Sequence, residues 1–163
     1  MTRIIRIMAA IALVCGFSMP PILPEPLPAA MTAGAVLEPE AELVEKLACA
    51  IYSEAGGDEC SDECRINVGD VILNRVKDPR FPNTIEGVLT APWQYGTFSQ
   101  TGIVWPARAS NPGEKHAVER AYDIARQLLS GNHGELWGKG YVWQAEFEQG
   151  SEGFWLDGLY FGR

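Results

Sequence analysis

A change in hydrophobic periodicity divides this chain into helical segments followed by a short β-rich end. Apolar residues recur at intervals of three and four, which predicts helices over residues 39–53, 61–76 and 112–129. Near the C-terminus, YVWQAEF and GLYFGR have the aromatic content and short length of strands. Helices followed by strands predict an α+β fold, mainly helical with a small C-terminal β-hairpin.

Capping residues place the ends of these helices. Ser61 is a predicted N-cap for the second helix, and Thr84 for a short helix over IEGVLTA. Asn111 and Pro112 are typical of the cap and first position of the last long helix. Gly69 in the middle of the second helix costs about 1 kcal/mol relative to alanine, so we expect a close helix crossing there.

The N-terminal region predicts export and a single folded domain. MTRIIR supplies two arginines, and IMAAIALVCGFSM supplies an apolar run of about a dozen residues, so residues 1–18 resemble a signal peptide. An uncleaved N-terminal anchor is the alternative. Residues 19–39 are rich in proline and alanine and predict an extended linker. Residues 40–163 then form one domain, which we expect to be monomeric and extracytoplasmic.

Charge and motif content exclude several classes of function. The net charge of −8 and the absence of a dense Lys/Arg cluster argue against nucleic-acid binding and against docking on anionic lipids. The sequence has no G-x-S-x-G motif and no phosphate-binding glycine loop. Its two histidines, His116 and His133, lack zinc-like spacing. We therefore expect no metal and no cofactor.

Three cysteines outside the signal segment raise the question of a disulfide. Export would place Cys49, Cys60 and Cys64 in an oxidising compartment. Three thiols allow at most one internal bond, and we predict a disulfide from Cys49 to either Cys60 or Cys64. Three free thiols are the alternative.

The stretch LACAIYSEAGGDEC places one glutamate, Glu54, where an apolar helix meets a glycine turn. A carboxyl desolvated by Tyr52 and its neighbours would hold its proton at higher pH, as a general acid requires. A solvated surface group at a helix end is the ordinary alternative. Like-charge repulsion from a following acidic cluster would also raise its pKa. This cluster consists of Asp58, Glu59, Asp62 and Glu63.

Several motifs together resemble the cell-wall hydrolase family of spore cortex-lytic enzymes (SleB type). They are IYSEAGGDE, VGDVILNRVKDPRFPNTIEGVL, GTFS, VWQAEF and GLYFGR, and they extend over residues 40–163. The resemblance implies a lysozyme-like fold and a lytic transglycosylase that acts on peptidoglycan glycan strands. It maps the catalytic role to Glu54, which would protonate the bond between N-acetylmuramic acid and N-acetylglucosamine and leave a 1,6-anhydro end.

Three other functions remain open at this stage. A muramidase would use water as acceptor and a second carboxylate, from Asp58, Glu59 or Asp62. An amidase is opposed by the poor supply of metal ligands. An inactive glycan-binding module is the non-enzymatic alternative.

Candidate substrate-binding residues lie in a long aromatic loop and near the C-terminus. In the loop, relatives often carry GQFS where this chain has GTFS, so Gln94 would replace the missing glutamine. Trp143 would stack on a sugar or pack in the core, and Asn74 would contact substrate or brace a loop. The full set of predicted substrate-binding residues is Asn74, Gln94, Tyr95, Phe98, Ser99, Trp143 and Gln144.

Overall fold

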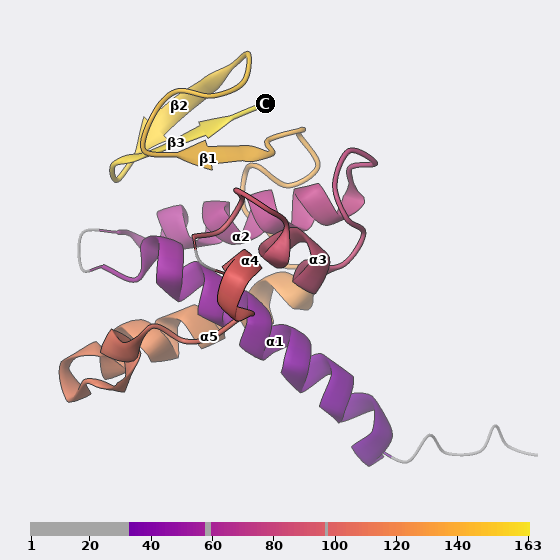
Figure 1. Cartoon of the computed structure of the whole chain (residues 1–163), viewed down its shortest axis with the longest axis vertical. Helices are drawn as coiled ribbons and strands as arrows, with labels where there is room; N and C mark the ends of the chain where they lie inside the picture. Colours follow the sequence, from indigo (N-terminus) through magenta and orange to yellow (C-terminus); the bar gives the residue numbers. More distant parts are fainter. Residues whose placement is uncertain (1–32, 58–59, 97) are drawn as a thin grey trace, which may run out of the picture. The chain divides into compact units, whose positions relative to one another are not determined.

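A computed structural model describes residues 33–57, 60–96 and 98–163, with side chains from residue 40 onward. Helices come first and a small sheet comes last, so the predicted α+β class is confirmed (Figure 1). The predicted signal peptide, residues 1–18, lies outside the described residues, as does most of the predicted linker. None of the helices in the described ranges has the length and hydrophobicity that a membrane span needs. The main elements are α1 (Ala33–Ala55), α2 (Asp62–Lys77), α3 (Ile85–Thr90), α4 (Phe98–Thr101), α5 (Lys115–Leu129), β1 (Trp143–Ala145), β2 (Gly153–Leu156) and β3 (Leu159–Gly162).

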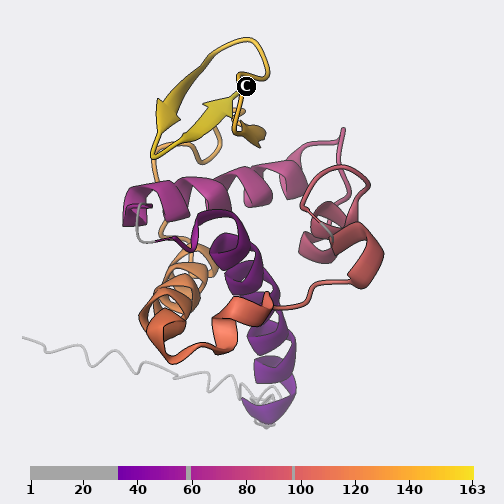
Figure 2. The same ribbon diagram turned by 60° about the vertical axis from the view of Figure 1, so that its left-hand side comes forward.

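Helix α2 lies at the centre of the domain. Helices α1 and α5 pack against it and against each other, and β1 contacts α2 from the other side (Figures 1 and 2). An apolar spacing of three and four would bury one stripe of this helix, but residues 67–75 are all buried. Because α2 is covered from both sides, the polar residues of this stretch are buried as well. These are Asn67, Asp70, Asn74 and Arg75.

Local signals place the helix starts correctly in two cases. The Ser61 hydroxyl accepts a hydrogen bond from the Cys64 N–H at 3.2 Å, and Thr84 Oγ1 accepts one from the Gly87 N–H at 3.0 Å. The close crossing at Gly69 is also confirmed, because a Cβ there would lie 2.2 Å from Leu128 Cδ1 of α5.

Two helix boundaries differ from the prediction. Helix α1 begins at Ala33, although the prediction began it at Pro39 because proline is rare inside helices. The last long helix begins at Lys115, because residues 112–114 form a separate 3₁₀ turn, η2. Asn111 precedes that turn without a side-chain capping bond.

The C-terminal sheet has three antiparallel strands in the order β1-β3-β2. The two predicted strands are confirmed, and β2 lies in the segment that we predicted as their connection. A tight turn at Asp157 and Gly158 joins β2 to β3, with φ of 49° and 82°. The Asp157 carboxylate accepts hydrogen bonds from the backbone N–H and hydroxyl of Ser61, so the hairpin turn is tied to the start of α2.

Candidate active site

The buried face of α1 leads to Glu54. Leu47 and Ile51 are fully buried at helical spacing, and Glu54 continues this face into the last turn of the helix. The helix ends at Ala55, and the turn that follows needs glycine at position 56, because a Cβ there would lie 2.2 Å from the Tyr52 carbonyl oxygen. Glu54 therefore stands at the end of a rigid helix, half-buried rather than in open solvent.

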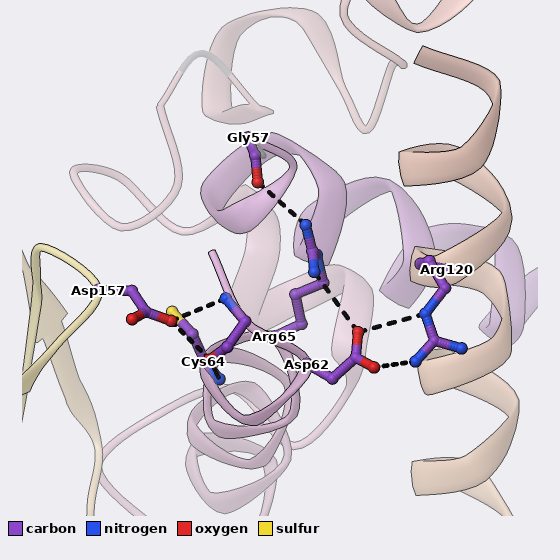
Figure 3. Close-up of polar contacts among 7 residues, drawn as sticks. Gly57, Asp62, Cys64, Arg65, Arg120 and Asp157 are labelled. Carbon is purple, nitrogen blue, oxygen red and sulfur yellow. Dashed lines mark hydrogen bonds and ion pairs between the residues drawn. The ribbon is translucent and has the colours of Figure 1, made fainter. Parts of the chain in front are cut away.

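Arginine side chains hold the turn that follows Glu54. Arg65 Nη2 donates a 3.0 Å hydrogen bond to the Gly57 carbonyl oxygen. The Asp62 carboxylate lies between Arg65 and Arg120, and Figure 3 shows both guanidinium groups pointing toward it. These contacts link the end of α1 to α2 and α5. They fix the backbone next to Glu54.

The predicted disulfide is absent: Cys49, Cys60 and Cys64 are free thiols. Cys49 lies on α1 near Ser53 and Glu45, whereas the Cys64 thiol contacts Cys60. Burial raises the pKa of Cys49 to about 11 and that of Cys64 to about 12. The turn after Glu54 is thus held by the arginine contacts and not by a covalent bond.

A pocket of about 430 Å³ opens beside Glu54. Helix α1 forms one side, and the other side comes from the long loop that we predicted as a binding loop. Within the described part of the chain, Glu54 is the one acidic residue that lines it. The lining residues are Ser53, Glu54, Tyr95, Gly96, Phe98, Thr101, Val104, Trp105 and Pro106.

Trp105 forms a fixed part of the pocket wall. Its ring stacks on Tyr122 at 5.3 Å and lies 5.6 Å from the ring of Tyr52. Its indole N–H donates to the Glu45 carboxylate. Contacts to both α1 and α5 therefore hold this side of the loop in place.

The environment of Glu54 favours the protonated carboxyl. Burial is the main cause that raises the pKa of Glu54, and the nearby carboxylate of Glu146 raises it further. A hydrogen bond from Gln144 and the positive charge of Arg75 act in the opposite direction. The Gln144 amide donates to Glu54 Oε2 over a long 3.4 Å distance.

Among the described residues, the carboxylate that acts on Glu54 lies outside the predicted acidic cluster. Glu146, which follows β1, acts on Glu54, whereas Asp62 is bound by the two arginines. Asp58 and Glu59 lie outside the described residues.

Three unpartnered polar atoms lie in the side chains around Glu54. The Tyr95 hydroxyl, Arg75 Nη1 and Gln144 Oε1 are buried without a hydrogen-bond partner among the described residues. Burial raises the pKa of Tyr95, the neighbouring Arg75 guanidinium lowers it, and the charge of Glu54 raises it. Buried polar groups are nearly always bonded, and a catalytic role is one explanation for atoms that are not.

The predicted substrate residues separate into those near Glu54 and those elsewhere. Tyr95 and Phe98 line the pocket, and Gln144 bonds to Glu54. Gln94 is half-buried in the same loop and Ser99 is exposed on α4, but neither lines the pocket.

Asn74 and Trp143 are engaged in contacts within the domain. The Asn74 amide group donates to the carbonyl oxygens of Leu136 and Tyr141, and its oxygen accepts from the Gly138 N–H. The Trp143 ring packs edge-on against Phe81 at 6.0 Å. These contacts match the bracing and packing alternatives that we gave for the two residues.

Sequence reasoning missed several residues at this site. It gave no role to Trp105, Val104 or Thr101, although all three belong to the aromatic loop. It left Arg75 open between a salt bridge and a substrate contact, and it overlooked Glu146. Among the described residues, no group of three His, Cys, Asp or Glu side chains could hold a metal ion.

A family model for cell wall hydrolases matches residues 60–152. The match includes more than half of the chain, so this chain belongs to the cell wall hydrolase family, as its motifs predicted. Membership implies peptidoglycan as substrate and action outside the cytoplasm. Glu54 precedes the matched range, which includes LNRVKDPRFPNTIEGV. Neither the curated proteins nor the solved structures contain a match to the chain.

Proposed function

We propose that this chain is a lytic transglycosylase that cleaves the bond between N-acetylmuramic acid and N-acetylglucosamine, with Glu54 as its single acid and base. The observation that carries the proposal is the position of Glu54. It is the acidic residue of the pocket lining, and burial raises its pKa. A carboxyl that keeps its proton can donate it to a glycosidic oxygen.

The reaction would proceed without water as a reactant. Glu54 gives its proton to the glycosidic oxygen as the bond from the muramoyl C1 breaks. The acetamido group of the substrate stabilises the positive centre. The Glu54 carboxylate then takes the proton of the muramoyl 6-hydroxyl as that oxygen bonds to C1. The enzyme recovers its proton, and the product carries a 1,6-anhydro ring.

The pocket walls suit a sugar chain. Tyr95, Phe98 and Trp105 present aromatic surface, and aromatic rings with a polar edge pack well on the mixed polar and apolar faces of sugars. The unbonded Tyr95 hydroxyl and Gln144 carbonyl oxygen could each receive a bond from a bound glycan. Gln144 would in addition keep the Glu54 carboxyl oriented.

Product analysis tests this function. Purified peptidoglycan is incubated with the protein, and the released fragments are analysed by mass spectrometry. Anhydromuramoyl ends are expected. Reducing muramoyl ends would indicate a muramidase, and free stem peptides an amidase.

Two variants connect the product to Glu54. Glu54→Gln is expected to abolish product formation, because an amide cannot donate the proton. Glu119→Gln is the matched control: it makes the same change at an exposed glutamate of α5. An active Glu54→Gln enzyme would refute the role of Glu54.

A further inference from the structure

Arg75 is a buried charge with an unused donor. Its side chain comes from α2 and is 3% exposed. Nε donates a 2.7 Å hydrogen bond to the Val142 carbonyl oxygen, just before β1, while Nη1 has no partner in the described part of the chain. A guanidinium has five N–H donors, and leaving one unbonded in the interior costs free energy. The unused Nη1 group therefore requires an explanation.

Aromatic rings keep the guanidinium of Arg75 in place. It lies over the rings of Phe81, Tyr95 and Trp143, at 5.4, 5.0 and 6.0 Å from their centroids. Such cation–π contacts, together with the bond to Val142, restrict its movement. Nη1 is thus unbonded although its neighbours hold the group firmly.

Glu54 is the group that could use this donor. The positive charge of Arg75 lowers the pKa of Glu54 against the effect of burial, so the two side chains are close enough to interact. Even so, the hydrogen bond found at Glu54 comes from Gln144 and not from Arg75. Within the described ranges, the other titratable groups that act on Glu54 or lie beside it are Glu146 and Tyr95.

We propose that Arg75 is a positioning residue for the acid–base cycle of Glu54, with Nη1 kept free to bind the carboxylate that proton donation creates. This inference rests on the proposed function. When Glu54 gives its proton to the glycosidic oxygen, a negative charge remains on its carboxylate, and Nη1 donates a hydrogen bond to it. Arg75 stays protonated throughout. When the carboxylate takes the proton of the 6-hydroxyl, the bond to Nη1 is released.

The arrangement explains how one carboxyl could serve in both steps. Burial alone favours the protonated acid but opposes the carboxylate that follows. A fixed cation that is not bound to the neutral acid stabilises the charged form selectively, because a charge-assisted bond is stronger than a neutral one. A permanent ion pair would instead hold Glu54 ionised.

The test measures the titration of Glu54 directly. The protein is labelled with carbon-13 at glutamate side-chain carboxyls, and the Glu54 signal is assigned by its loss in Glu54→Gln. Arg75→Gln removes the charge but keeps an amide donor for the Val142 carbonyl. Its Glu54 midpoint, and the alkaline limb of its pH–rate profile, are expected to move to higher pH. Arg80→Gln is the matched control: this exposed arginine also lies near the Phe81 ring. It should shift neither the Glu54 midpoint nor the alkaline limb of the pH–rate profile.

Arg75→Lys keeps the charge and tests the second donor. Its ammonium can replace Nε at Val142 but offers no separate group for Glu54. We expect a Glu54 midpoint between those of the wild type and Arg75→Gln, because the charge stays but the bond from Nη1 is lost. We also expect a kcat at least tenfold lower, with little change in KM. An unmoved midpoint in folded Arg75→Gln would overturn the proposal. If that variant does not fold, a wild-type kcat in Arg75→Lys would do the same. An active Glu54→Gln would instead refute the proposed function itself, so the two failures can be told apart.

Discussion

The Tyr95 hydroxyl offers a direct way to separate stability from function. Tyr95 is 2% exposed, and its hydroxyl has no hydrogen-bond partner among the residues that the structure describes. An unbonded buried polar group costs about 1–3 kcal/mol. Tyr95→Phe removes this group and leaves the ring, so we expect the free energy of unfolding to rise by about 1 kcal/mol. For a domain of this size the melting temperature would rise by about 4 °C.

The same substitution should lower activity. If the hydroxyl bonds to bound glycan, its loss should reduce kcat/KM about tenfold, which corresponds to about 1.4 kcal/mol. Thermal unfolding followed by circular dichroism, together with the rate of fragment release, measures both effects. Tyr52→Phe is the control, because the buried Tyr52 hydroxyl donates to Glu114 at 2.8 Å and its removal should destabilise the fold. A Tyr95→Phe variant that is less stable than the wild type would show that the hydroxyl has a protein partner, which contradicts the reasoning.

Three further predictions concern the packing and charges of the fold. Gly69→Ala should lower the free energy of unfolding by about 1–2 kcal/mol despite the better helix propensity, because the new methyl group would collide with Leu128; urea denaturation would measure it. Asp70→Ala should lower the free energy of unfolding by about 2–4 kcal/mol, because the fully buried Asp70 carboxylate accepts hydrogen bonds from His133 at 3.0 Å and from a backbone N–H at 2.9 Å. Asp70→Asn keeps an acceptor, so the same assay should show a smaller loss. Glu54→Gln should be more stable than the wild type at pH 7, because burial raises the pKa of Glu54 and its native carboxylate therefore costs stability above the ordinary glutamate pKa. This advantage should disappear as the pH falls below that ordinary value, and an advantage of equal size at pH 3 and pH 7 would count against it.

Local signals were sufficient for the helix starts that depend on neighbouring residues. Ser61 and Thr84 cap helices through bonds to N–H groups three residues later, and such contacts can be read from a short window. Gly69 was informative because glycine destabilises a helix interior, so its presence there indicated that another helix packs closely against it. The position of Glu54 between an apolar helix and two glycines likewise indicated its half-buried place.

Long-range contacts set the rest of the site. Arg75 bonds to the carbonyl of Val142, which is 67 residues away in the sequence, and no pattern within α2 identifies that partner. Glu146, which follows β1, likewise acts on Glu54 from a distant part of the sequence. Strand β2 could have been predicted, because Asp157 and Gly158 form an Asp-Gly pair of the kind that favours tight hairpin turns. We did not predict this strand because the segment before the turn lacks a clear alternation of apolar and polar residues.

The central claim is that a sugar hydroxyl, rather than water, accepts the muramoyl group while Glu54 moves the proton. Digestion of purified peptidoglycan in water enriched in heavy oxygen tests it, with mass spectrometry of the new muramoyl ends. We predict ends that carry no heavy oxygen and are lighter by one water than hydrolysed ends. Heavy oxygen in the new ends would mean that water attacks, and the account of a single carboxyl with an internal acceptor would be wrong.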